Sequence, residues 1–314
     1  MKIQFLFLFF FSILLSCKKE TKPIKEVKLN QYLTVLGTVQ DGGYPHIGCQ
    51  KQCCTDFYSG KRDKKSVVSL GLVDLQNQQK WIFEATPDLH TQLADLENYH
   101  LKTKTLIDGV FLTHAHIGHY TGLMYFGREA YGKKNTPVYA MPKMKLFLEE
   151  NGPWSQLISL QNIRLKELKQ DSVLALNSTL KVTPFLVPHR DEFSETVGYK
   201  IEGTKKSALF IPDIDKWQKW NKNIIEEVKT VDYAFVDATF LNQNEVKRAM
   251  TEVPHPFIEE TLLLFKDEPL ETKNKVIFIH FNHTNPTLQK DSKERLAIEK
   301  LGFRFADEGT NFEL

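Results

Sequence analysis

Residues 111–123 read FLTHAHIGHYTGL, and this stretch decides how the chain is expected to fold. An apolar run ends at Thr113, and His114, His116 and His119 follow within six positions before a helix-like run begins. Alternate residues of an extended loop point the same way, so the first two rings can share a face while a turn brings the third round. Imidazoles gathered at a strand end suit zinc, iron or another borderline metal. The alternative is a set of surface or capping histidines, but three of the chain's 10 histidines packed this closely favour a metal site.

Three later apolar segments also end in a side chain that can bind metal. An apolar run leads to His189, another to Asp213 and a third to His280. Taken in order with residues 111–123, these segments resemble the metal-binding motifs of the metallo-β-lactamase superfamily, whose signature is H-x-H-x-D-H. The resemblance implies that His189 and His280 bind metal and that Asp213 bridges two ions.

The superfamily resemblance also implies a fold and a cofactor. The fold is the αββα four-layer sandwich, in which two mixed sheets lie face to face with helices outside and metal at one sheet edge. The cofactor is a divalent metal, with zinc expected and iron or manganese as alternatives. One or two ions would be held with a position left open for water.

Longer motifs are similar to one branch of the superfamily, which contains coenzyme PQQ synthesis protein B and the phosphoribosyl cyclic phosphodiesterase of phosphonate breakdown. They occur in the branch's order along the whole chain after the N-terminal segment. The motifs are Gly37…DGGYP (41–45)…Cys49, FEATPD (83–88), VPHRDE (187–192), VDATF (236–240) and His280…TNP (284–286).

One position departs from the superfamily signature. Its aspartate is replaced by Gly118, which offers no ligand. By the resemblance, the ligands of one ion would then be His114, His116, His189 and Asp213. The ligands of the other ion would be only His119, Asp213 and His280. We therefore expect one tightly held ion and a second that is weak or absent, and a catalytically inactive fold stays open.

The general base is also open, because the missing aspartate often orients the attacking water in this superfamily. Asp213, Asp237 or a metal-activated water alone could serve. Asp237 ends an apolar strand and is expected to orient a metal-bound imidazole rather than to bind metal itself. His255 lies where family members often have a substrate-contacting histidine, with a packed or helix-capping role as the alternative.

Cys49, Cys53 and Cys54 form a second candidate site. The branch resemblance implies a structural zinc here, with His46 or His283 as the fourth ligand. The alternative is a group of free or partly oxidised thiols. An odd count with two adjacent cysteines excludes a disulfide scaffold.

The N-terminal segment has the pattern of an export signal. Lys2 precedes an apolar run over residues 3–15, which is shorter than a membrane span. The run ends in LLSC (14–17), which resembles the lipobox of bacterial lipoproteins, with a plain signal peptide as the alternative. We expect a signal peptide over 1–16, lipidation of Cys17, a polar tether over 17–30 and a cell-envelope location, periplasmic or surface-exposed.

Composition and pattern favour one globular domain over residues 31–314. The chain has 41 basic and 39 acidic side chains, and this balance excludes a nucleic-acid-binding protein that works through a basic surface. Strands cluster early and then alternate with helices, which favours a layered α/β fold. Strands are expected over 32–37, 66–75, 80–84, 109–113, 137–140, 179–187, 197–202, 208–211, 233–236, 276–280 and 303–306, and helices over 88–99, 142–150, 216–228, 256–265 and 288–301.

These features predict a lipid-anchored extracytoplasmic metal-dependent hydrolase. It would cleave an ester, phosphodiester or lactone-like bond of a small molecule, would contact the membrane through Cys17 and would not bind nucleic acid. The export signal argues against a role in PQQ synthesis, since modification of a ribosomal peptide needs cytoplasmic enzymes. Two alternatives are an iron-dependent oxidative enzyme related to PQQ synthesis and a non-catalytic metal- or ligand-binding lipoprotein.

Overall fold

The structure is a computed structural model that describes residues 30–245, 249 and 252–314. The expected signal peptide, Cys17 and all of the expected tether before residue 30 lie outside the described residues. No helix in the described part of the chain has the length and apolar character needed to cross a bilayer.

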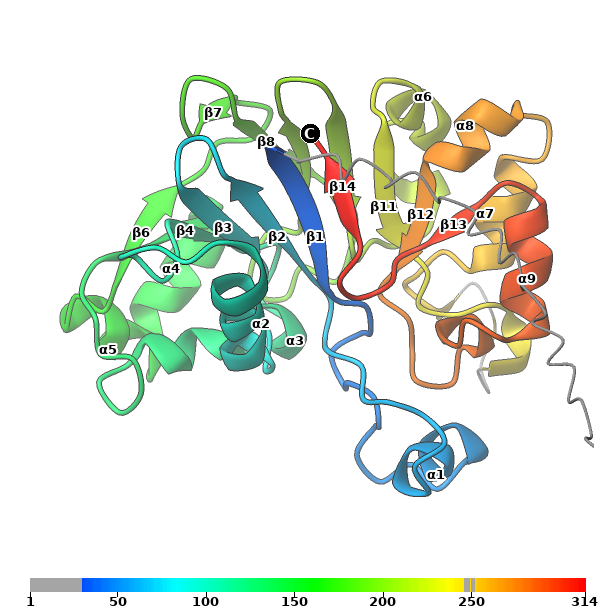
Figure 1. The fold of residues 1–314 in the computed structure, drawn as a ribbon, viewed down its shortest axis with the longest axis horizontal. Coiled ribbons are helices and arrows are strands. Elements are labelled where there is room, and N and C mark those ends of the chain that lie inside the picture. The colour runs from blue at the N-terminus through cyan, green and yellow to red at the C-terminus, as the bar shows by residue number, and fades with distance from the viewer. Residues whose placement is uncertain (1–29, 246–248, 250–251) are drawn as a thin grey trace, which may run out of the picture.

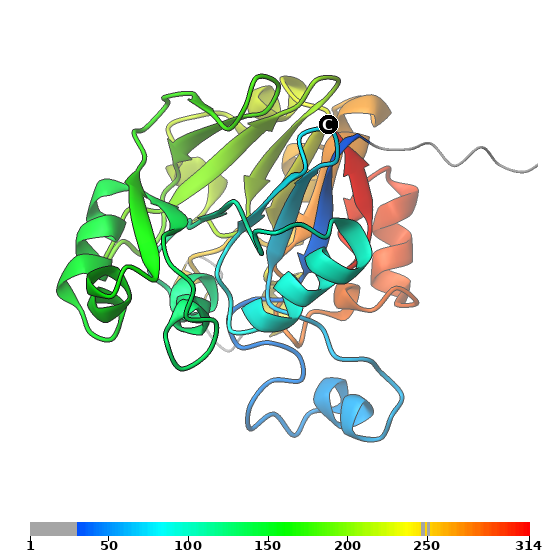
Figure 2. The same cartoon turned by 60° about the vertical axis from the view of Figure 1, so that its left-hand side comes forward.

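Two seven-stranded sheets form the centre of the molecule, with helices against their outer faces (Figures 1 and 2). This arrangement confirms the αββα sandwich. The first sheet has the order β14-β1-β2-β3-β4-β5-β6. Its strands are β1 (Gln31–Gly37), β2 (Ser69–Asp74), β3 (Gln79–Phe83), β4 (Gly109–Phe111), β5 (Thr136–Ala140), β6 (Ile163–Glu167) and β14 (Asn311–Glu313).

The second sheet has the order β13-β12-β11-β10-β9-β8-β7. Its strands are β7 (Leu174–Ala175), β8 (Lys181–Leu186), β9 (Val197–Glu202), β10 (Ser207–Ile211), β11 (Tyr233–Asp237), β12 (Val276–Ile279) and β13 (Arg304–Phe305). The α-helices are α1 (Gln52–Tyr58), α2 (Leu89–Asp95), α3 (Ile117–Tyr120), α4 (Pro142–Glu150), α5 (Trp154–Ser159), α6 (Ile224–Lys229), α7 (Ile258–Leu264), α8 (Leu270–Lys275) and α9 (Lys293–Lys300).

Alternation along β1 shows how the sequence builds the layers. Leu33 and Val35 belong to the core cluster between the two sheets, whereas Tyr32 and Leu36 belong to the cluster beneath the helices of the first sheet. Successive side chains of a strand point to opposite faces, so a strand that is apolar at every position is buried on both sides.

Strand direction brings the ends of several strands to one edge of the sandwich. In the first sheet β3, β4, β5 and β6 are parallel, and in the second sheet β10, β11, β12 and β13 are parallel. β8 runs in the same direction as β10, because both are antiparallel to β9 between them. Residues that follow β4, β8, β10, β11 and β12 therefore meet at a common edge.

Two expected helices differ from the structure at their N-termini. The helix expected over 216–228 is a short 3₁₀ turn followed by α6, which begins after Asn223, whose side chain accepts from the backbone N–H of Ile225 at 2.9 Å. The helix expected over 288–301 begins at Lys293, because Ser292 caps it by accepting from Arg295 N–H at 3.2 Å.

Candidate metal centre

Asp213 lies at the middle of a cluster of histidines at this sheet edge. It follows β10 and is 3% exposed. Its Oδ2 atom lies 3.2 Å from His189 Nε2, 3.5 Å from His114 Nε2, 3.8 Å from His119 Nε2 and 3.9 Å from His280 Nε2. Its Oδ1 atom lies 3.1 Å from His255 Nδ1.

The cluster contains three overlapping sets of possible ligands that share Asp213. The first set is His114, His116, His189 and Asp213, the second is Asp41, His119, Asp213 and His280, and the third is Asp213, Asp237, His255 and His280. In each set the four ligand atoms lie within 4.8 Å of one another. The structure thus brings together every histidine that the sequence predicts as a ligand of this site.

The spacing of the first set fits a tetrahedral ion. His116 Nδ1 lies 2.8 Å from His114 Nε2 and 3.3 Å from His189 Nε2. Ligands bound at the usual zinc distances in a tetrahedron lie about 3.3 Å from one another. Asp213 Oδ2 lies 3.5 Å from His114 Nε2 and 3.2 Å from His189 Nε2, so most ligand atoms of this set are already close to the separations that such an ion requires.

Unpaired polar atoms give a second reason to place metal here. Five buried side-chain nitrogen or oxygen atoms lack a hydrogen-bond partner among the described residues, and four of them belong to this cluster. They are His119 Nδ1, His189 Nδ1, Asp213 Oδ1 and His280 Nε2. Leaving such a group unpaired costs about 1–3 kcal/mol. A divalent ion in the second set would satisfy His280 Nε2, which lies 3.7 Å from Asp41 Oδ1 and 3.9 Å from Asp213 Oδ2.

A hydroxyl and a carboxylate orient His114 from behind. Thr113 Oγ1 donates to Glu84 Oε1 at 2.6 Å, and it lies 2.9 Å from His114 Nδ1. Because the hydroxyl hydrogen is used on Glu84, Thr113 accepts from His114 Nδ1–H, which leaves Nε2 free to bind metal. Glu84 is fully buried, has a φ of 79° and also places Oε1 at 3.2 Å from His119 Nδ1.

The second sheet repeats this arrangement behind His280. Thr239 Oγ1 donates to Asp237 Oδ1 at 2.7 Å and lies 2.9 Å from His280 Nδ1. The same reasoning leaves His280 Nε2 free to face the ion. Asp237 thus lies where it can orient an imidazole, as its position at a strand end predicts.

His255 lies beside both buried aspartates. Its Nδ1 atom is 2.8 Å from Asp237 Oδ2 and 3.1 Å from Asp213 Oδ1. Burial opposes the charged ring, but the two carboxylates outweigh burial and raise the pKa of His255 to about 10. The ring is therefore a cation at neutral pH, with its Nδ1–H held by Asp237.

The pKa values of His114 and His119 are shifted in opposite directions, because their charged neighbours differ. Burial and the charge of His119 hold the pKa of His114 well below its usual value. Burial also opposes the charged form of His119, yet the carboxylates of Glu84 and Asp41 raise its pKa well above the usual value. His114 is therefore neutral and ready to bind, while a metal at His119 must displace a proton.

Three functional residues escape sequence reasoning. Asp41, from the loop after β1, places a carboxylate oxygen beside the three ligands expected for the second set, where the sequence suggests no candidate. Glu84 and Thr239 lie within the quoted FEATPD and VDATF motifs, which could have identified them as residues of interest but gave no role.

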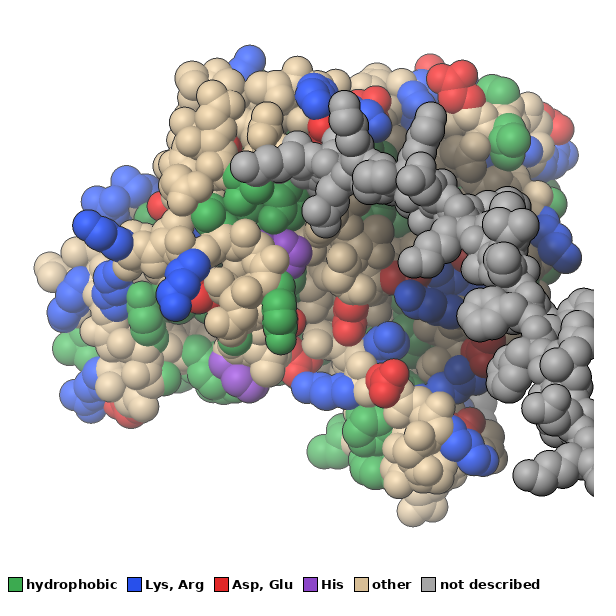
Figure 3. All heavy atoms as spheres, in the orientation of Figure 1, with side chains coloured by type: hydrophobic (Ala, Val, Ile, Leu, Met, Phe, Trp, Pro, Cys, Tyr) green, Lys and Arg blue, Asp and Glu red, His purple; other side chains and the backbone are tan. Residues whose placement is uncertain are grey.

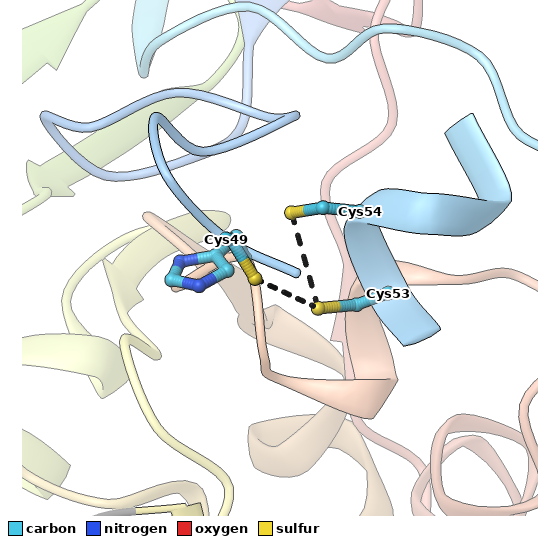
Figure 4. A group of neighbouring side chains, drawn as sticks. Cys49, Cys53 and Cys54 are labelled. Carbon is cyan, nitrogen blue, oxygen red and sulfur yellow. Dashed lines mark hydrogen bonds between the residues drawn. The ribbon is translucent and has the colours of Figure 1, made fainter. Parts of the chain in front are cut away.

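The cysteines form a separate site on the loop that carries α1, which extends below the sheets in Figure 1. Cys49, Cys53, Cys54 and His283 place their ligand atoms within 4.8 Å of one another. The thiols face one another in Figure 4, with Cys53 Sγ lying 3.9 Å from Cys49 Sγ and 4.0 Å from Cys54 Sγ. His46 stacks on the His283 ring at 4.2 Å, so of the two expected histidines it is His283 that joins the thiols.

Known proteins resemble the chain in sequence and in fold. The beta-lactamase superfamily domain matches residues 80–281, more than half of the chain. Coenzyme PQQ synthesis protein B of Gluconobacter oxydans is 27% identical, covering 89% of this chain and 97% of that protein. The protein of the same name from Methylorubrum populi is 24% identical, covering 90% and 100%.

Solved structures show the same fold. Zinc-bound PqqB from Methylobacterium extorquens has a TM-score of 0.73 at 21% identity, covering 90% of this chain and 100% of that chain. A diphosphatase from the PhnP family has a TM-score of 0.62 at 22% identity, covering 90% and 97%. With the ligand sets at the sheet edge, these matches show that the chain belongs to the metallo-β-lactamase superfamily, in the branch of coenzyme PQQ synthesis protein B.

Proposed function

We propose that this protein is a metal-dependent hydrolase that cleaves a phosphodiester or related ester bond in an anionic small molecule. The observation that carries the proposal is Asp213, which the first and second ligand sets share and which lies 3.1 Å from His255 at the wall of a cavity. Zinc is the metal we propose, because neutral imidazoles with one shared carboxylate are its usual ligands. When bound there, the metal supplies a Lewis acid and an activated water.

His255 has the features of a general acid. It lines a cavity of about 390 Å³ beside the ligand sets. Its Nδ1–H is held by Asp237, with Asp213 Oδ1 3.1 Å away, so its Nε2–H is the proton that it can give to a leaving-group oxygen. Asp237 keeps the ring charged until that transfer.

Arg190 supplies a cationic group to this cavity. It lines the cavity together with Gln40, Phe240, Asn282 and the carboxylate of Glu252. It is exposed and makes no hydrogen bond or ion pair with other described residues, so its guanidinium is free to receive a ligand. Guanidinium groups bind phosphate and carboxylate oxygens in a bidentate manner, which supports an anionic substrate.

The surface charge is compatible with a small-molecule substrate. Basic and acidic side chains lie interspersed on the face shown in Figure 3, in line with a net charge of +2. A nucleic-acid-binding surface would gather one sign of charge.

We also propose that the chain is exported and anchored by a lipid on Cys17. The support is the LLSC motif at residues 14–17 after a short apolar run. Mass spectrometry of the protein extracted from membranes tests this: a diacylglyceryl-modified N-terminus at Cys17 supports the anchor. An unmodified chain in the soluble fraction that starts at Met1 would overturn it.

Activity is tested with the purified, zinc-loaded chain on bis(p-nitrophenyl) phosphate and p-nitrophenyl acetate. We expect turnover that Asp213→Asn abolishes. Arg190→Ala should raise KM for the anionic diester and leave the neutral ester unchanged. Arg164→Ala, which removes an exposed arginine from β6, is the matched control.

The outcome decides between enzyme and binding protein. Metal bound at the histidines with no turnover of either ester would contradict the hydrolase and favour a binding role. Oxygen consumption by the iron-loaded chain without ester cleavage would favour the oxidative alternative.

A further inference from the structure

We propose that Asp41 is the carboxylate ligand of the second ion, and that Gly118 is the residue that admits it. The superfamily signature places this carboxylate at position 118, whereas here it comes from the loop after β1. The inference rests on the metal site of the proposed function but not on hydrolysis.

Asp41 reaches the histidines of the second set directly. Its Oδ1 atom lies 3.1 Å from His119 Nε2 and 3.7 Å from His280 Nε2. The latter nitrogen is buried and has no hydrogen-bond partner among the described residues. It faces the space between Asp41 and Asp213, where an ion would be bound by all four residues.

Gly118 makes room for Asp41. A Cβ atom at position 118 would lie 2.5 Å from Asp41 Cα, 2.7 Å from its Cγ and 2.8 Å from its Cβ. Such contacts are impossible without moving the loop backbone, so a side chain at 118 and Asp41 in this place exclude each other. The two positions are alternative sources of one carboxylate.

Gly118 also holds the carboxylate in orientation. Its backbone N–H donates to Asp41 Oδ2 at 3.3 Å, which leaves Oδ1 to face the histidines. Gly118 has no side chain to bind the ion, but its backbone N–H orients the carboxylate of Asp41 toward it.

The loop before Asp41 is fixed against the strand end that carries His280. Gln40 N–H donates to Phe281 O at 2.9 Å, and Phe281 N–H donates to Thr38 O at 2.9 Å. The Gln40 side chain also donates to Asn282 Oδ1 at 3.2 Å. A ligand held on paired backbone next to another ligand keeps its position without the metal.

The test measures metal rather than activity. The chain is stripped with a chelator and reloaded with zinc, bound ions are counted by elemental analysis, and the affinity of each ion is measured by competition with a chromophoric chelator. The variants are Asp41→Asn, which is nearly isosteric, and Gly118→Ala, which removes no ligand. Asp56→Asn, on the α1 loop, and Gly152→Ala, where a Cβ meets nothing within 4 Å, are the controls.

We expect Asp41→Asn and Gly118→Ala each to weaken one histidine-site ion at least tenfold, taking the loss of a supporting group, about 10–100-fold, as the lower bound. The other histidine-site ion and the cysteine-site ion should be unchanged, as should both controls.

The outcomes separate this inference from the proposed function. If the unaltered chain holds no ion at the histidines, the proposed function fails and the inference fails with it. If it holds two there and Asp41→Asn binds both with unchanged affinity, the inference alone is overturned. An effect of Asp41→Asn without one of a folded Gly118→Ala would overturn the role of Gly118, and a Gly118→Ala chain that does not fold leaves Asp41→Asn to decide the ligand.

Discussion

Replacing Glu84 with glutamine tests whether the residues behind the histidines set metal affinity. Glu84 accepts from Thr113 Oγ1 at 2.6 Å and from Thr113 N–H at 3.3 Å, and it lies 3.2 Å from His119 Nδ1. Glutamine keeps the size but removes the charge and replaces one acceptor with a donor. Thr113 then loses its fixed role toward His114, and His119 loses its carboxylate.

The expected magnitude follows from these contacts. A group that supports a metal ligand contributes about 10–100-fold to affinity, which is about 1.4–2.7 kcal/mol. Because Glu84 stands behind one histidine of the first ligand set and one of the second, both ions should bind more weakly. Chelator competition with zinc measures this directly.

Glu97→Gln is the matched control. Glu97 pairs with the fully buried Lys80 at the other end of β3, far from the histidines. Breaking a buried pair costs about 3–5 kcal/mol of stability, so the control weakens the fold more than the metal site. The reasoning is refuted if Glu84→Gln is at least as stable as Glu97→Gln and still binds zinc with an affinity within threefold of that of the unaltered chain.

Three further predictions concern other parts of the molecule. In the metal-free chain, iodoacetamide should modify Cys49 before Cys53 at pH 8. Burial opposes ionisation of Cys49, but a backbone hydrogen bond from Lys51 and the other thiols lower the pKa of Cys49. Burial and the neighbouring thiols raise the pKa of Cys53 to about 12. Peptide mass spectrometry measures the order of modification, and equal rates would contradict the prediction. Burial and neighbouring positive charge lower the pKa of His283 to about 4. As the pH falls from about 6.5 to 4, the unfolded chain therefore takes up a proton that the folded chain does not, and the free energy of unfolding of the metal-free chain decreases. Urea unfolding should show a smaller decrease over this range in His283→Gln. Arg295→Leu, which removes the paired contacts to Asp307 at 2.8 and 3.0 Å, should lower the free energy of unfolding by about 3 kcal/mol in the same assay, and an unchanged value would contradict it.

The sequence predicts those parts of the fold that have local patterns. The hairpin expected over 66–75 and 80–84 is present as β2 and β3, because both runs are apolar and separated by a short polar turn. The strand β6 was missed because it lies at a sheet edge with mostly polar or half-exposed side chains. β14, with only three residues, carries too short a pattern to be recognised.

The same limit applies to the metal centre. His114, His189 and His280 follow apolar runs, so each has a local signal at a strand end. Asp41 opens the DGGYP motif (41–45), but the motif gives it no role, because the proposed ligand role depends on a contact with Gly118, 77 positions away. Only the packing of the β1 loop against that glycine reveals that the missing carboxylate is present.

The positions of the ligands along the chain determine when, during synthesis and folding, the metal centre can form. The second set extends from Asp41 to His280, and β1, which leads into the loop that carries Asp41, has its outer edge covered only by β14 near the C-terminus. During synthesis the N-terminal part of a chain emerges first. A nascent chain that ends before β12 already contains His114 and His119 but has no complete second set. Metal capture at the second set is therefore a late event in the life of this polypeptide, and the ion cannot guide the early steps of its folding.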